Sequence, residues 1–456
     1  YYGMRALLIL FMTKTAAQGG LGFPTSKAGA IYGLYTAMVF LLSVPGGWIA
    51  DRITGQRRAV LWGGIVIALG HFSMAVPRLE TFYLGLGLIV LGTGLLKPNI
   101  STMVGALYTR DDARRDGGFS IFYMGINIGA LLAPLVCGYL GENINWHYGF
   151  GAAGVGMTLG VVQYAYGAKF LGAAGTGISG SPKDFRLFKR LLVASVVLSV
   201  IGGAAAVAGW MAFSAEAVSN AFGVALALIV VGLFGWLLSS KEYTPLERRH
   251  VWAILVLFLA AALFWSAFEQ AGSTLNLFAD RNTNLHAWDF SAWGLFRASY
   301  YQSFNSLFII ALAPVFAWYW VRLGKRGPSS TAKFSWGLLF VGLGFAVLIP
   351  VANSTNVSPW WLTLVYLLHT IGELCLSPVG LSAMTRLAPA RAVGMMMGVW
   401  FLADSVGNFV GGRLASVYET FPLPLLFGAV AGFCVALAIV LVFLIRPMKH
   451  LSEGVN

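Results

Sequence analysis

Four charged residues stand inside long apolar stretches of this 456-residue chain: Arg5, Lys97, Glu269 and Glu373. A charged side chain at the centre of a bilayer costs at least about 2.5–3.5 kcal/mol, so it normally faces protein or water and serves a function. The two cations lie in the first half of the sequence and the two acids in the second. Such a set could bracket a zwitterion, and an amino acid or a peptide is a molecule of that kind.

Each of the four charges also has a structural interpretation. Arg5 could extend to the bilayer surface from a position near a helix end. Lys97 could pair with another helix, although a kink at the following Pro98 would free carbonyl groups and could turn the lysine into a cavity. Glu269 lies deep in its segment, where its protonation would respond to desolvation and to nearby cations, as a proton carrier requires. Permanently paired structural acids are the less favoured interpretation of Glu269 and Glu373.

Five further residues could contribute to a binding site. Asn127 and Asn305 lie in apolar segments, where an amide can hydrogen-bond either a substrate or a neighbouring helix. Tyr2, Trp265 and Trp400 could line pockets for substrate side chains or fill the space between helices. For these residues the type alone does not decide between binding and packing.

The composition indicates that this is a membrane protein. Hydrophobic residues make up 58% of the chain and charged residues 10%, against roughly 25% charged residues in soluble domains. The net charge is +13, but the basic residues punctuate the gaps between apolar segments and form no tract, so nucleic-acid binding is not expected. Three cysteines lie far apart inside apolar runs, which predicts neither a disulfide framework nor a zinc site.

Fourteen segments are long and apolar enough to span a bilayer, which takes about 20 residues. They cover residues 1–18, 28–51, 58–77, 82–107, 117–141, 147–169, 186–213, 217–240, 250–280, 296–322, 332–352, 359–386, 391–419 and 422–446. The even number places both ends of the sequence on one side of the membrane. Because residue 1 is a tyrosine inside an apolar stretch, we expect the natural N-terminus to lie upstream.

The distribution of Lys and Arg predicts the orientation. Of the 30 basic residues, 22 fall in one set of alternating gaps, among them Arg110, Lys325, Arg326 and Arg391. The other gaps hold only Lys14, Lys27, Arg78 and Arg281. Positive charges are retained in cytoplasmic loops, so the first set of gaps and both ends are predicted to be cytoplasmic.

The predicted fold is an all-α membrane protein with two six-helix bundles and two extra helices between them. Residues 1–171 would form the first bundle, its first helix incomplete at the N-terminus. Residues 172–249 would provide a Gly- and Ser-rich linker and the two extra helices, which carry no intramembrane charge. Residues 250–446 would form the second bundle and 447–456 a cytoplasmic tail. Two related six-helix halves are typical of secondary transporters.

The sequence contains no HExxH, GxSxG or Walker motif, so an enzyme is not expected. The GxG fragments at Gly85/Gly87 and Gly92/Gly94 lie in a lipid-spanning run and lack the strand that a nucleotide site requires. A passive channel is less favoured than a transporter because no filter-like run is present. We predict no cofactor and no metal, with protons as the coupling ion.

Several motifs resemble the proton-dependent oligopeptide transporter family, a branch of the major facilitator superfamily. The opening YYGMRALL resembles the end of that family's first-helix ExxERFxYYGMRALL block, and GGWIADRITGQR at 46–57 resembles the loop motif of the wider superfamily. Similarity to the narrower family extends over both halves, in GTGLLKPNIS (92–101), DARRDGGFSIFYMGINIGALLAP (112–134), FWSAFEQAGSTLNLFA (264–279) and GELCLSPVGLS (372–382). The two extra helices match its bacterial members.

The resemblance implies roles for the candidate residues. Arg5 and Lys97 would attract a peptide carboxylate, and Glu269 would be the titrating site coupled to it. Glu373, together with Asn127 and Asn305, would hold the peptide amino group. Tyr2, Trp265 and Trp400 would line the cavity. The implied activity is import of di- and tripeptides with protons, by alternating access, through a monomer in the cell (inner) membrane.

Three features depart from the family pattern. The ExxER part, which is linked to proton coupling, is absent from this sequence. Phe40 stands where many members have a substrate-contacting tyrosine, and Arg297 and Ser306 stand where members often carry prolines. Because related members carry different cargo, transport of another small anionic or amphiphilic molecule, such as nitrate or a drug, is the alternative prediction.

Overall fold

The computed structural model describes residues 1–108, 114–207, 214–241, 243–289, 296–324, 327–389 and 393–452. Four cations used to predict the orientation, Arg110, Lys325, Arg326 and Arg391, lie outside these residues, as do 453–456 of the predicted tail. Within the described ranges the regular secondary structure is helical apart from one isolated bridge between Thr283 and Val357, and nine helical stretches are long and apolar enough to cross a membrane. The predicted class of all-helical membrane protein is confirmed.

The helices follow the predicted segments closely. Their bounds are α1 Tyr2–Thr13, α2 Thr25–Leu41, α3 Ser43–Ile49, α4 Gln56–Met74, α5 Leu79–Ala106, α6 Arg115–Gly138, α7 Trp146–Gly167, α8 Pro182–Val207, α9 Ala215–Ser239, α10 Pro245–Phe268, α11 Thr274–Asn282, α12 Gln302–Leu323, α13 Ser330–Leu348, α14 Pro359–Leu387, α15 Val393–Ser416 and α16 Leu423–Leu451. The last of these continues into the predicted tail 447–456. Two predicted segments, 28–51 and 250–280, each contain two helices.

Local sequence explains where the helices begin. Thr244 caps α10: its hydroxyl accepts from the backbone N–H of Glu247, and the Glu247 side chain accepts from the backbone N–H of Thr244. Pro245 occupies the first helical position, where its missing N–H costs nothing. Ser329 caps α13 in a similar way, accepting from the N–H of Ala332 at 3.3 Å. Helix α5 continues through Pro98.

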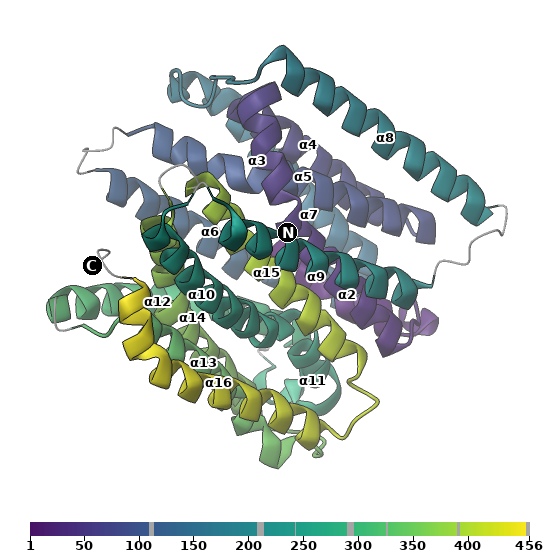
Figure 1. Ribbon diagram of the computed structural model, residues 1–456. Helices are drawn as coiled ribbons and strands as arrows, with labels where there is room; N and C mark the ends of the chain where they lie inside the picture. Colours follow the sequence, from purple (N-terminus) through teal and green to yellow (C-terminus); the bar gives the residue numbers. More distant parts are fainter. Residues whose placement is uncertain are drawn as a thin grey trace. The chain divides into compact units, whose positions relative to one another are not determined.

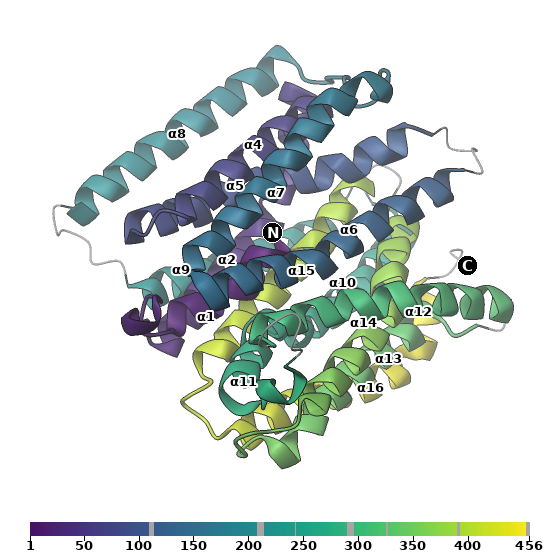
Figure 2. The ribbon, with the colours of Figure 1, turned by 180° about the vertical axis from the view of Figure 1, so that it is seen from behind.

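The described chain divides into two compact units. The first contains Tyr1–Ala37, Ile126–Gly149 and Gly223–Asn456. Within it, α13 lies between α14 and α16 and packs against both (Figure 1). Helix α10 packs closely on α15, where a Cβ on Gly407 would come within 2.9 Å of the Ala262 carbonyl oxygen. Seen from behind, α12 lies against α14 (Figure 2).

The second unit contains Met38–Gly125 and Phe150–Phe222. Its helices α4 and α5 run side by side, because glycines let their backbones approach. A Cβ on Gly63 would come within 2.7 Å of the Gly92 carbonyl oxygen, and a Cβ on Gly70 within 2.9 Å of that of Gly85. The predicted bundles at 1–171 and 250–446 divide the chain at different points, and they stay a prediction.

The predicted linker is held against the loop between α3 and α4. The N–H of Arg57 donates to the Gly175 carbonyl at 3.0 Å, and the N–H of Ser179 donates to that of Asp51 at 2.8 Å. Arg52 and Asp184 add an ion pair at 3.4 Å. This segment is therefore ordered by backbone hydrogen bonds within the second unit, although its composition is that of a flexible linker.

Candidate functional site

The centre of the site is a break in the membrane-spanning stretch that runs from Pro245 to Asn282. Helix α10 ends at Phe268, a 3₁₀ turn covers Glu269–Gly272, and α11 begins at Thr274. A break inside a membrane frees carbonyl groups, which must find other donors. Here they find side chains from elsewhere in the first unit.

Three side chains donate to the freed carbonyls. Arg5 of α1 donates to the Glu269 carbonyl at 3.4 Å. The Ala271 carbonyl accepts from Gln302 of α12 and from the hydroxyl of Tyr366 of α14, the latter at 3.2 Å. The break is thus attached to three other helices, so a change at the turn can be transmitted to all of them.

A buried ion pair joins α1 to the turn. The Nη2 group of Arg5 donates a hydrogen bond to the Glu269 carboxylate. The two side chains are only 8% and 7% exposed. The Nε of Arg5 donates to the hydroxyl of Tyr32, on α2, at 2.8 Å. Two charges removed from water stabilise each other only while they are closely paired, so removing either side chain would leave the other as an unpaired buried charge.

Gly272 makes this arrangement sterically feasible. A Cβ at this position would overlap the Tyr32 hydroxyl and lie 3.0 Å from Arg5 Nε. A side chain there is therefore incompatible with the present positions of Tyr32 and Arg5.

The second predicted acid, Glu373, lies on α14 in the same unit. The side-chain amide of Asn305, on α12, donates to its carboxylate at 2.8 Å and to the Thr370 hydroxyl at 3.1 Å. Thr370 donates in turn to the carbonyl of Tyr366 at 2.7 Å. Two predicted residues are therefore in direct contact, and the Asn305–Glu373 pair links α12 to α14.

The remaining candidates in the first unit differ in exposure. Trp265 is buried, its indole N–H has no partner among the described residues, and its ring meets Phe268 edge-on with centroids 5.3 Å apart. Trp400 and Asn127 are also buried. Tyr2 is 43% exposed. Of the three predicted aromatic residues, the two tryptophans are packed and the tyrosine is accessible.

Lys97 belongs to the second unit, where it lies over an aromatic ring near the end of helix α2. Its Nζ lies 3.5 Å from the centroid of the Phe40 ring, a cation–π geometry. The side-chain amide of Asn99, two residues on, donates to the Leu95 carbonyl at 2.7 Å. Pro98 has no N–H to donate to the Gly94 carbonyl, yet α5 stays continuous beside the lysine.

Several residues of this network were not predicted. Tyr32, Gln302, Tyr366 and Gly272 all contact the broken turn or the ion pair. The run QAGST, which follows Glu269, holds a glycine between polar residues in an apolar segment and is a recognisable signal for a break. The other three residues are uncharged and carried no comparable signal.

Charged residues also gather at the end of α11. Lys14, just after α1, pairs with Asp280 at 2.7 Å, and the adjacent Arg281 pairs with Glu419 at 2.6 Å. Glu419 also accepts from the hydroxyl of Thr25 at 2.5 Å. We call these two ion pairs, together with the hydrogen bonds of Thr25, the α11 latch, because they connect α11 to the end of α1, the start of α2 and the turn after α15.

The hydroxyl of Thr25, and then Arg281, lower the pKa of Glu419 below its ordinary value. A carboxyl group whose pKa is lowered by folding contributes stability above its unfolded pKa, and this contribution disappears as pH falls through the folded value. The Glu419 part of the α11 latch is therefore complete at neutral pH. It is lost only below the ordinary pKa of a glutamate.

Comparison with known sequences decides the family. The sequence model of the PTR2 (POT) family matches residues 57–430. The chain belongs to the POT family. The peptide transporter YePEPT of Yersinia enterocolitica is 40% identical over 475 residues, covering 100% of this chain and 92% of its own length. The di-/tripeptide transporter of Lactococcus lactis subsp. cremoris is 37% identical over 471 residues, covering 100% and 94%.

Solved structures agree with this assignment. A crystal structure of the peptide transporter POT in complex with sulfate matches with a TM-score of 0.93 at 41% identity, covering 100% of this chain and 93% of the other. A POT family transporter in complex with 5-aminolevulinic acid matches with a TM-score of 0.91 at 34% identity, covering 98% and 93%. This POT family chain is accordingly a multi-pass membrane transporter of the major facilitator fold and not an enzyme.

Proposed function

We propose that this POT family member imports di- and tripeptides together with protons by alternating access. The observation that carries the proposal is the buried Arg5–Glu269 pair at the break between α10 and α11. The names of its relatives add support, since two that match along the whole chain are peptide or di-/tripeptide transporters. We place both termini on the cytoplasmic side of the cell membrane.

The proposed substrate contacts use opposite charges. Arg5 and Lys97 attract the peptide carboxylate, while Glu373, with Asn305 and Asn127, holds the amino group. Tyr2, Trp265 and Trp400 surround the peptide side chains. A zwitterion suits this set because both of its charges would be neutralised away from bulk water.

The proposed coupling step is an exchange of partners. When Glu269 takes up a proton its attraction for Arg5 falls, and Arg5 becomes available to the peptide carboxylate. Two conformations of similar energy can be shifted by such an exchange, because each state depends on which pair is formed. A proton moving inward also gains about 2.3 kcal/mol for each 100 mV of inside-negative potential.

The α11 latch has a proposed place in this cycle. With both termini cytoplasmic, the end of α11 lies on the outer side, and the contacts of the latch hold the end of α1, the start of α2 and the turn after α15 to α11. Opening toward the outside would then require these pairs to separate.

The function is tested by uptake of labelled dialanine into liposomes that contain the purified protein. We expect accumulation above the outside concentration when an inward pH gradient is imposed, and loss of accumulation when a protonophore is added. Nitrate should not compete with the dipeptide. Uptake that only equilibrates would indicate a channel, and competition by nitrate without transport of dialanine would indicate the alternative cargo.

Exchanging the charges of the Lys14–Asp280 pair tests the latch. We expect Lys14→Asp and Asp280→Lys each to lower uptake roughly fivefold, because like charges then face each other at a partly exposed site worth about 1 kcal/mol. The double variant K14D/D280K restores opposite charges and should recover most of the uptake. Initial rates of dialanine uptake at equal protein amounts provide the measurement.

Lys27→Gln is the matched control, because Lys27 lies over the Phe23 ring, 3.8 Å from its centroid, near the start of α2 and is not part of the latch. Its uptake should equal that of the parent. A double variant no more active than the two single variants would contradict a role for the pair.

A further inference from the structure

An apolar groove lies between three helices of the first unit, away from the ion-paired turn. It has a volume of about 420 Å³ and lies between the last turns of α12, the first half of α13 and the middle of α14. Its walls include Trp318 and Trp320 of α12, Trp336 of α13 and Cys375 of α14. Trp318 is 57% exposed, so the groove opens on the outside of these helices.

Two cations lie on the aromatic wall of the groove. The Nζ of Lys333 lies 4.2 Å from the centroid of the Trp320 ring, and the Cζ of Arg322 lies 5.1 Å from that of Trp318. Among the described residues no carboxylate pairs with either cation. A ring face satisfies part of the charge and leaves N–H donors available to an anion.

The two kinds of surface match the two ends of one molecule. An apolar groove without polar lining, bordered by cations at the predicted cytoplasmic end of its helices, is complementary to an acyl chain joined to a negatively charged head group. Tryptophans at this level are also typical of the boundary between lipid tails and water. We propose that the groove binds one anionic phospholipid, with an acyl chain between α12, α13 and α14 and the phosphate against Arg322 and Lys333.

The groove borders α12 and α14, the two helices that carry Asn305 and Glu373. Ile371 and Cys375 of its wall flank Glu373 along α14, and the Glu373 carboxylate accepts from Asn305 of α12. A chain inserted here would therefore support the two helices that hold this pair. This proposal concerns a lipid site and does not depend on which solute is carried.

The test compares phosphatidylglycerol with phosphatidylcholine bound to the purified full chain, measured by native mass spectrometry. We expect the parent to retain phosphatidylglycerol at roughly tenfold to thirtyfold lower lipid concentration, since each cation near an anionic head group contributes about 1 kcal/mol. The double variant R322Q/K333Q should lose most of this preference.

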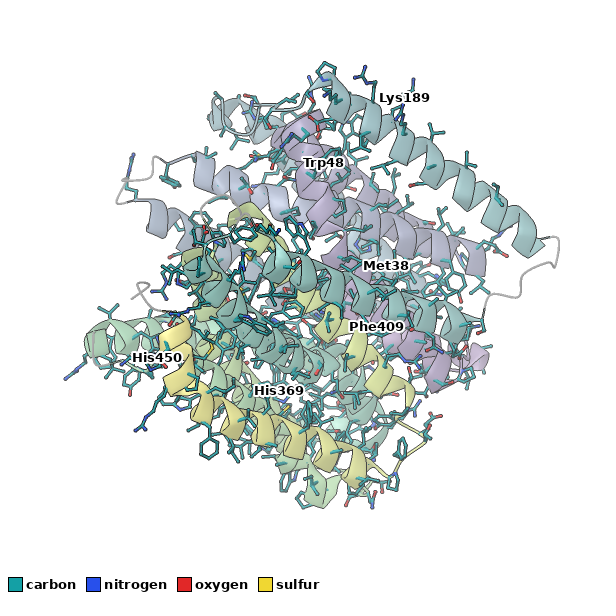
Figure 3. The ribbon with its side chains drawn as sticks, viewed as in Figure 1. Met38, Trp48, Lys189, His369, Phe409 and His450 are labelled. Carbon is teal, nitrogen blue, oxygen red and sulfur yellow. The ribbon has the colours of Figure 1, made fainter. Side chains whose placement is uncertain are left out.

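The matched control is K189Q/R190Q, which removes two exposed cations of α8, where Lys189 points away from the ribbon (Figure 3). It should keep the preference. A third variant, Leu339→Trp, fills the groove and should weaken binding of both lipids without changing the charges. Equal loss in R322Q/K333Q and K189Q/R190Q, or equal binding of the two lipids by the parent, would overturn the proposal. Unchanged lipid binding by Leu339→Trp would show that the groove is not the lipid site.

Discussion

Replacing Glu269 with glutamine is expected to abolish proton-driven accumulation of dipeptide while leaving exchange between internal and external dipeptide measurable. Glutamine keeps the size of the side chain but cannot take up a proton, and it leaves Arg5 without its buried counter-ion. Breaking a buried pair by removing one partner costs about 3–5 kcal/mol, so the equilibrium between conformations should shift as well. Accumulation is measured in liposomes with an imposed pH gradient, and exchange is measured without one.

Glu80→Gln is the matched control for this substitution. Glu80 is exposed in the first turn of α5, so the same chemical change should leave both accumulation and exchange at the parental level. If Glu269→Gln accumulates dipeptide as well as the parent, with and without the gradient, Glu269 is not the coupling residue. If it loses exchange as completely as accumulation, the residue serves binding or folding instead.

Gly272→Ala is expected to lower uptake by roughly tenfold or more, with a measurable loss of thermal stability. The new methyl group would overlap the Tyr32 hydroxyl, and forcing a methyl group into a packed site typically costs about 1–3 kcal/mol. Because the displaced group holds Arg5, the damage should extend to substrate and proton handling. Initial uptake rates and the melting temperature of the purified protein provide the two measurements.

Gly432→Ala serves as the control, since a Cβ on that glycine of α16 meets nothing within 4 Å. It should match the parent in both measurements. Adding Tyr32→Phe to Gly272→Ala removes the hydroxyl that the methyl group would overlap. A double variant with partly recovered melting temperature would support the steric explanation, whereas full activity of Gly272→Ala alone would refute it.

The sequence located the charges better than their partners. Arg5 and Glu269 could be singled out because an ion inside an apolar segment is costly, whatever the fold around it. Tyr32 and Gln302 could not, since an uncharged polar residue in a helix is common and its direction depends on the rotation of that helix. The same limit applies to Lys97, whose contact with Phe40, near the end of α2, accompanies the packing of α5 beside α3.

Helix lengths were predictable to within a few residues, but the break between α10 and α11 was not predicted. The segment 250–280 is apolar enough that its average hides the turn at Glu269–Gly272. The break is stable only because Arg5, Gln302 and Tyr366 supply donors from three other helices, and this supply is a property of the folded chain. The α11 latch was missed for a similar reason: Lys14 and Arg281 served only to predict orientation, and the acids with which they pair are brought to them by the folded chain.

The two halves of the latch differ in their contact with water. Glu419 is 57% exposed beside Arg281, whereas Lys14 and Asp280 are 26% and 14% exposed. Dissolved ions screen exposed charges far more than sheltered ones. Rising ionic strength should therefore weaken the two ion pairs of the α11 latch one after the other. The pair that holds the turn after α15 should weaken first, and the pair that holds the end of α1 should weaken later. The end of α11 should therefore separate from the turn after α15 more easily as the salt concentration rises.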